Sequence, residues 1–299
     1  TRYSGRPMAS TSTSSSTGTN ARGSSGMISP AFSFFDLLGY QFFQYALIGG
    51  SLAAFACGWI GLFLVLRREA MIVDGVAHTA FGGIAIGIFL GIDPILSALV
   101  VSILAVLGIS YMRGKGLAHS DSATAVMLAL GFSTGLIVVS LAGGFSVDLF
   151  TYLFGSILTI SQQDLLLVTA LGLVVLAFLT LFYKEILAIT FDAESARMMG
   201  IPVRTISLIF NLIVALTIIL SIRIIGIILV VALIVLPALA ALQLRLSFRR
   251  TVVSTVLIGV LSTVLGVIVS AFYNVATSGI IVFTMVAVYL IVAAYARLG

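Results

Sequence analysis

The chain has 299 residues, of which 61% are hydrophobic and only 8% are charged, and its formal net charge is +5 at pH 7. Soluble domains carry about 25% charged residues, so this composition excludes a soluble enzyme or binding module and predicts an all-α polytopic membrane protein. The positive balance is then no sign of nucleic-acid binding, and the single cysteine, Cys57, excludes a disulfide framework and a cysteine zinc site.

Residues 1–26 differ from the rest of the chain. They are rich in serine, threonine and glycine, and they lack the apolar run of a signal peptide. We interpret them as a vector-derived leader or a disordered tail. Residues 27–299 are assigned to one transmembrane domain.

Nine segments are apolar enough and long enough to cross a bilayer, whose core needs about 20 mostly apolar residues per helix. They are residues 42–66, 71–90, 95–112, 122–141, 165–183, 205–222, 226–244, 251–272 and 279–296. Residues 148–160 are too few to cross and are typical of a re-entrant or interfacial segment.

The basic residues predict the orientation of these nine spans. If the N-terminus is outside and the C-terminus inside, eleven Lys and Arg residues lie on the inner side, and only Arg223 lies in an outer connection. Cytoplasmic loops are enriched in Lys and Arg, so the asymmetry favours this orientation. The outer connections are short, and a separate protein would have to capture a substrate outside.

Segment 71–90 carries Asp74 and His78, which lie one turn apart on the same face of a helix. A carboxylate and an imidazole can together hold zinc, manganese or iron(II). Two ligands make a weak site, as conduction requires, and a homodimer would supply a second pair. The alternatives are a proton relay in a secondary carrier and a structural pair that hydrogen-bonds between helices.

Small residues form a second row on the adjacent face of the same segment, again four apart, and such a row lets another helix approach closely. The row consists of Gly75, Thr79, Gly83, Gly87 and Gly91. Pro237, inside segment 226–244, removes a backbone hydrogen bond and is expected to kink that span.

Residues 190–202, TFDAESARMMGIP, predict a short, sharply bounded helix in an inner loop. Asp192 suits its N-cap, Glu194 its first turn and Arg197 its last, while Gly200 and Pro202 end it. The alternative is a connector lying on the membrane surface. Mixed charges favour docking to a cytoplasmic partner, since lipid binding favours a basic face.

Five ordered blocks carry a resemblance from about Phe42 to the C-terminus. They are MIVDGVAHTAFGGIAIG, DSATAVMLALGFSTGLIVVSL, FDAESARMMGIPVR, GIILVVALIVLPALAALQL and SGIIVFTMVAVYLIV. The chain resembles the membrane permease subunits of zinc, manganese and iron importers of the ATP-binding cassette type, often called the ABC-3 family.

This resemblance implies a homodimeric permease, a pair of cytoplasmic ATPases and an extracytoplasmic metal-binding protein. Asp74 and His78 match the family's pore-lining pair. The residues that match its ATPase-coupling helix are Phe191, Asp192, Glu194, Ser195, Arg197, Met198, Met199 and Gly200. The sequence contains no G-x-x-x-x-G-K-[ST] motif, so ATP hydrolysis would belong to another subunit.

We therefore expect a transport subunit, not an enzyme, in the bacterial cell membrane. It would import zinc or manganese, with iron(II) as a further candidate, by alternating access, and would hold no permanent cofactor. One alternative is a proton-coupled metal carrier. Another is a permease for an iron chelate or vitamin B12, although so large a cargo needs a wide cavity without ion ligands.

Overall fold

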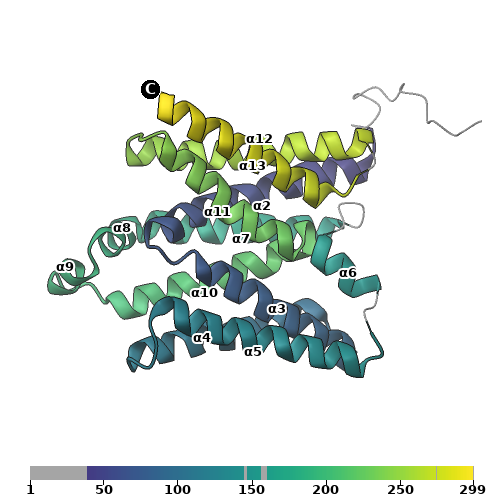
Figure 1. Cartoon of the computed structure of the whole chain (residues 1–299), viewed down its shortest axis with the longest axis horizontal. Helices are drawn as coiled ribbons and strands as arrows, with labels where there is room; N and C mark the ends of the chain where they lie inside the picture. Colours follow the sequence, from purple (N-terminus) through teal and green to yellow (C-terminus); the bar gives the residue numbers. More distant parts are fainter. Residues whose placement is uncertain (1–38, 145–146, 156–159, 274, 299) are drawn as a thin grey trace, which may run out of the picture.

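The computed structural model describes residues 39–144, 147–155, 160–273 and 275–298, and the predicted leader lies outside these residues. The described residues are organised as helices that run roughly side by side (Figure 1). They are α2 (Gln41–Leu66), α3 (Met71–Leu90), α4 (Pro94–Gly114), α5 (Ser120–Leu141), α6 (Val147–Phe154), α7 (Gln162–Leu181), α8 (Tyr183–Phe191), α9 (Ala193–Met198), α10 (Val203–Ile225), α11 (Ile227–Gln243), α12 (Phe248–Tyr273) and α13 (Thr277–Leu298).

Among the described residues, eight helices are long and apolar enough to cross a membrane. They correspond to eight of the nine predicted spans. The ninth, predicted at 226–244, forms α11, which has only 17 residues and is about 26 Å long at 1.5 Å per residue. The count of nine spans therefore stays a prediction. Helix α6 has 8 residues, and all but the first belong to the segment 148–160 that was expected to be too short to cross.

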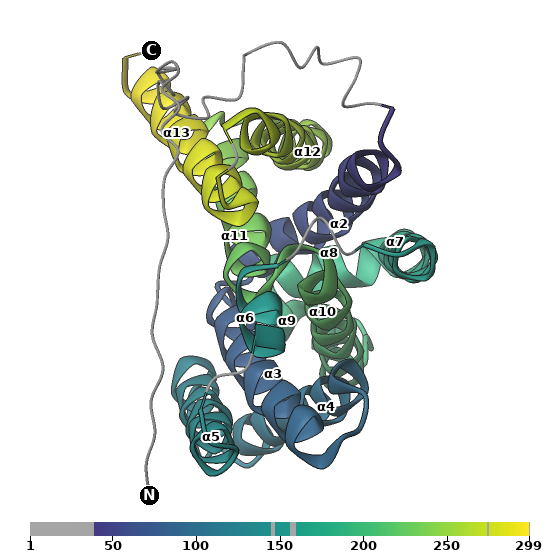
Figure 2. The ribbon, with the colours of Figure 1, turned by 90° about the vertical axis from the view of Figure 1, so that its right-hand side faces the viewer.

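Helix α3 lies at the centre of one part of the bundle and packs against α4, α5, α10 and α11. Of the 18 consecutive residues that make up the most apolar part of α3, 72% are buried. The corresponding fraction is 22% for α5 and 11% for α13. Since α5 and α13 leave most of their surface uncovered within one chain, lipid or another chain is expected to cover them. Figure 2 places α5 and α13 on the left side of the molecule and α7 on the right.

One end of the bundle gathers basic side chains, and we call it the basic end. Arg67 reaches Ser207 at the start of α10, and Arg113 at the end of α4 reaches Glu69. Helices α8 and α9 lie at the same end, on the left of Figure 1, whereas α6 lies at the opposite end. These contacts join the neighbouring ends of α2, α3, α4 and α10.

The opposite end contains a tight crossing between α6 and the joint of α10 and α11. Gly155 and Gly226 both have positive φ angles, of 75° and 83°. A Cβ at Gly226 would lie 2.4 Å from the Gly155 nitrogen, so the two backbones touch. Glycine is the residue that adopts this conformation without strain.

Arg223, near the end of α10, pairs with the buried carboxylate of Asp164 in the first turn of α7. Burial of the Asp164 charge requires a cationic partner, and Arg223 supplies it.

Candidate functional site

Asp74 and His78 lie on the exposed edge of an otherwise buried helix. Asp74 is in the first turn of α3, and His78 Nε2 is 3.8 Å from Asp74 Oδ1. The His78 and Asp74 side chains remain 37% and 46% exposed, although the residues between them are buried. Both polar groups are thus accessible from outside the chain, within the first eight residues of an apolar helix.

An aromatic cluster from α5 borders this pair. The His78 and Phe132 rings meet edge to face, with centroids 5.3 Å apart and planes at 83°, and Phe132 also contacts Phe81 with centroids 5.4 Å apart. Edge-to-face contact is a favoured arrangement of aromatic rings. Phe132 therefore packs against the imidazole of His78, whose side chain stays 37% exposed.

A single chain supplies only two ligands here. Within the described residues, no group of three or more His, Cys, Asp and Glu side chains could hold a metal ion. A closed protein site for zinc has four ligands. The pair alone can thus bind a cation only weakly, with water or another chain filling the remaining positions.

The row of small residues on α3 lies against two neighbouring helices. A Cβ at Gly75 would be 2.5 Å from Thr124 of α5, and Thr79 fits against Gly131 of the same helix. A Cβ at Gly83 would be 2.6 Å from Ala98 Cα of α4, and one at Gly87 would be 2.8 Å from Pro94 Cα. Only residues without larger side chains allow helices to approach this closely.

Helix α9 projects from the basic end and has a well-defined cap. Asp192 Oδ1 accepts hydrogen bonds from the backbone nitrogens of Glu194 and Ser195, at 3.0 and 3.1 Å. The Ser195 hydroxyl donates to the other carboxylate oxygen, and chiefly this bond lowers the pKa of Asp192. Gly200, with a φ of 82°, ends the turn. This hydrogen bonding defines the short helix locally.

The surface of α9 combines charged and apolar side chains. Glu194 and Arg197 are exposed in its first and last turns, and Ala196 is buried. The exposed apolar side chains are Phe191 at 71%, Met198 at 82% and Met199 at 67%. Such an apolar group on a charged helix is typical of a surface that binds another protein.

A family model described as the ABC 3 transport family matches residues 39–296. The chain belongs to this family. As a member of it, the chain is a multi-pass membrane subunit of an ATP-binding cassette transporter. Such permease subunits are not catalytic, and ATP is hydrolysed by a separate subunit.

Individual proteins match over most of their lengths. A Treponema pallidum protein named "Probable metal transport system membrane protein" is 34% identical over 264 residues, which are 88% of this chain and 98% of that protein. The manganese transport system membrane protein MntC of Halalkalibacterium halodurans is 32% identical over 250 residues, 83% of this chain and 86% of that protein.

A solved structure agrees with this fold. The structure of PsaBC from Streptococcus pneumoniae in complex with Fab contains a chain that is 29% identical to this one, with a TM-score of 0.77. The match covers 88% of this chain and 96% of that chain. The arrangement of helices is therefore that of the matched chain in this PsaBC structure.

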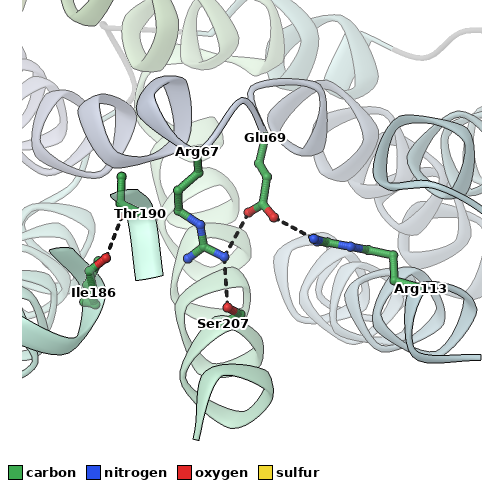
Figure 3. Close-up of polar contacts among 6 residues, drawn as sticks. All are labelled: Arg67, Glu69, Arg113, Ile186, Thr190 and Ser207. Carbon is green, nitrogen blue, oxygen red and sulfur yellow. Dashed lines mark hydrogen bonds and ion pairs between the residues drawn. The ribbon is translucent and has the colours of Figure 1, made fainter. Parts of the chain in front are cut away.

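The basic end of this ABC 3 permease holds a buried charge network that sequence analysis missed (Figure 3). Glu69 Oε2 lies 3.2 Å from Arg67, and Oε1 lies 2.8 Å from Arg113. Arg67 also donates to Ser207 Oγ at 2.9 Å and lies over the ring of Phe210. Burial lowers the pKa of the Arg67 guanidinium, and the Glu69 carboxylate opposes that shift.

This network joins the turn between α2 and α3 to α4 and α10. Arg67 and Arg113 are two of the eleven basic residues that predict the inner side, and their positions in the sequence do not indicate that they share a partner. The one available signal was Glu69, an acidic residue directly after two arginines at the end of a span.

Pro237 lies inside α11 and is buried, and its ring faces Gly259 of α12.

Proposed function

We propose that this chain is the membrane-spanning subunit of an importer that carries a divalent transition metal into the cytoplasm by alternating access. The Asp74 and His78 pair carries the proposal. Its two donors are accessible on a buried apolar helix. Ionisable residues in a membrane span are costly and therefore point to function.

Depth supports transport over surface binding. His78 is the eighth residue of α3, so it lies about 12 Å along the helix at 1.5 Å per residue. The hydrocarbon core is about 30 Å thick. An ion at this depth has lost bulk water, and a neutral imidazole and a carboxylate replace part of its hydration shell.

Two copies of the chain form the proposed permease. The exposed pair offers two ligands, and a second copy facing it would bring the count to four, the number found in closed zinc sites. The sparsely covered α5, which borders the pair through Phe132, suits a surface that another copy covers. The shared site would form between the two chains.

The proposed orientation places the basic end and the C-terminus in the cytoplasm and the N-terminus outside, as the distribution of Lys and Arg favours. In this orientation α11 crosses as the ninth span, which keeps the alternation of loops. Helix α9 then faces the cytoplasm, where an ATPase pair would dock on Phe191, Glu194 and Met198. An extracytoplasmic metal-binding protein would deliver the ion to the opposite end.

Manganese is the first candidate for the cargo. A relative with 32% identity is named as a manganese transport protein, and carboxylate donors suit manganese. The imidazole of His78 also suits zinc and iron(II), so these ions are the natural competitors in an assay. A bulky metal chelate would make no use of the two donors.

The test is uptake into proteoliposomes that contain this chain with its partner ATPase. We expect uptake of radioactive manganese that requires ATP and the binding protein and is inhibited by excess zinc or iron(II). Uptake driven by a pH gradient without ATP would instead identify a proton-coupled carrier. Transport of an iron chelate or vitamin B12 in preference to the free ions would also contradict the proposal.

A further inference from the structure

An open cavity of about 880 Å³ lies at the basic end between α4, α9 and α10. Arg113, Arg197 and Arg204 line it near the helix ends, and Leu107 and Leu208 line it farther along the spans. The cavity thus has cations at one end, and Leu107, Leu208 and the amide of Asn211 line its other end. A ligand that fits it is anionic at one end and largely apolar, with a polar group for Asn211, at the other.

The cationic part of the cavity retains uncompensated positive charge. Among the described residues, the ion pairs at this end join Glu69 to Arg67 and Arg113. No ion pair within the same residues involves Arg197 or Arg204, which are both exposed. Two arginines with free donors therefore face the cavity, beside a third that Glu69 only partly neutralises.

Arg204 lies against the end of α4. A Cβ at Gly114 would be 2.6 Å from Arg204 Nη2, so the guanidinium rests on the glycine of the neighbouring helix. Its charge is thereby held at the cavity, although it arises from α10. A planar guanidinium in this position can bind a phosphate through two parallel hydrogen bonds.

The cavity also contains a buried polar group without a partner. Asn211 is 2% exposed, and its Oδ1 has no hydrogen-bond partner among the described residues. Such groups are costly unless a ligand or water satisfies them. An amide accepts from a hydroxyl and donates to a carbonyl, so a ligand that reaches Asn211 can satisfy it.

The position of the cavity indicates where its ligand comes from. The lining extends from Gly114 to Leu107 on α4, about 10 Å along the helix axis at 1.5 Å per residue. It lies between membrane-spanning helices, and Figure 2 places α4 and α10 farther right than the uncovered α5 and α13. On α4 the lining residues Leu107 and Tyr111 are 42% and 58% exposed, so a ligand from the bilayer can enter the cavity on this side.

We propose that this cavity binds one anionic phospholipid of the membrane leaflet at the basic end. Its phosphate binds Arg204 and Arg197, its ester region lies near Asn211, and its acyl chains pack on Leu107 and Leu208. Basic pockets between membrane helices on the cytoplasmic side are known to bind such headgroups. Assignment to the inner leaflet rests on the orientation proposed above, but lipid binding itself does not.

The test uses the purified full-length chain in a non-ionic detergent, titrated with phosphatidylglycerol or phosphatidylcholine. We expect native mass spectrometry to detect bound phosphatidylglycerol and thermal unfolding to shift upward more with phosphatidylglycerol than with phosphatidylcholine. Arg204→Gln and Arg197→Gln should each weaken phosphatidylglycerol binding about fivefold, the ratio that corresponds to about 1 kcal/mol per basic residue. Both side chains are exposed, so folding should survive.

Arg250→Gln is the matched control, because Arg250 is an exposed arginine in the first turn of α12 that does not line the cavity. An equal loss with this variant would mean diffuse surface charge and would overturn the proposal. Equal shifts with the two lipids, or the same shift with inorganic phosphate, would also overturn it. Loss of ATPase binding in the Arg204→Gln variant with unchanged lipid binding would assign the cavity to the ATPase. None of these readouts depends on metal transport.

Discussion

The imidazole of His78 and the carboxylate of Asp74 are close enough to share one cation, and both remain accessible from outside the chain. We predict that His78→Ala and Asp74→Ala each reduce metal uptake by more than about 100-fold, since even indirect disturbance of a metal ligand costs about 10-fold to 100-fold in affinity. Uptake into proteoliposomes at matched protein levels measures the effect.

Asp121→Asn is the control for these two variants, because Asp121 is an exposed carboxylate in the first turn of α5. It should leave uptake unchanged. A purely structural pair predicts a different result, namely lower thermal stability and less protein in the membrane. Normal uptake by His78→Ala at the wild-type membrane level would remove the basis for the metal-permease proposal.

Glu69 is the acceptor for two arginines in a buried network, with 7% of its side chain exposed. Glu69→Gln should lower the free energy of unfolding by about 3–5 kcal/mol, because it leaves buried positive charge without a partner. Thermal unfolding in detergent would show the loss. The double variant Glu69→Gln, Arg67→Met should recover part of the lost stability. If it is as unstable as Glu69→Gln alone, the unpaired charge of Arg67 is not the cause of the loss.

At the scale of the elements, the sequence was most informative where the signal is local. Long apolar runs predicted the eight membrane-length helices, and the Asp192 cap with Gly200 predicted the bounds of α9 closely. Contacts between distant residues were not predictable. Glu69 and Arg113 are 44 residues apart, and Arg67 and Ser207 are 140 apart, and no periodicity or cap relates residues so separated.

The role predicted for the row of small residues can be tested where α3 packs on α4. A Cβ at Gly83 would be 2.6 Å from Ala98 Cα, whereas one at Gly172 of α7 would meet nothing within 4 Å. Gly83→Ala should lower the free energy of unfolding by about 1–3 kcal/mol through overpacking. Gly172→Ala should instead be neutral or stabilising by up to about 1 kcal/mol, because alanine favours the helix.

Thermal unfolding of the two alanine variants under identical conditions provides the comparison. Both replace a glycine in the middle of a membrane-length helix, so their intrinsic helix propensities change alike. The difference between them therefore reports the helix contact alone. Equal free energies of unfolding for the two variants would show that α3 and α4 can move apart at Gly83 without loss of stability.

At the scale of the whole molecule, the sequence predicted a membrane permease but not how its parts are connected. The charge network fixes the turn between α2 and α3 to α4 and α10, and α8 and α9 lie at the same end. The Asp74 and His78 pair on α3 and the short helix α9 therefore belong to one packed unit. Helices α9, α8, α10 and α3 pack in succession, so we expect motion imposed on α9 to reach α3 along them.

A charge reversal at Glu194 tests whether α9 transmits motion from the ATPase to α3. Glu194 is exposed in the first turn of α9, where a negative charge complements the helix N-terminus and can meet a partner protein. We predict that Glu194→Lys uncouples ATP hydrolysis from transport, so that metal no longer stimulates the ATPase and uptake falls at least about 10-fold, as a coupling loss of about 1.4 kcal/mol implies. ATPase activity and uptake are measured together in proteoliposomes.

Asp121→Lys is the control, because it makes the same charge reversal in the first turn of α5, also at the basic end. It should leave both activities unchanged. The fold of the Glu194→Lys variant should survive, since Glu194 is exposed and, within the described residues, only its backbone nitrogen takes part in the helix cap. If the variant binds its ATPase and transports normally, α9 is not the surface through which the ATPase moves the helices.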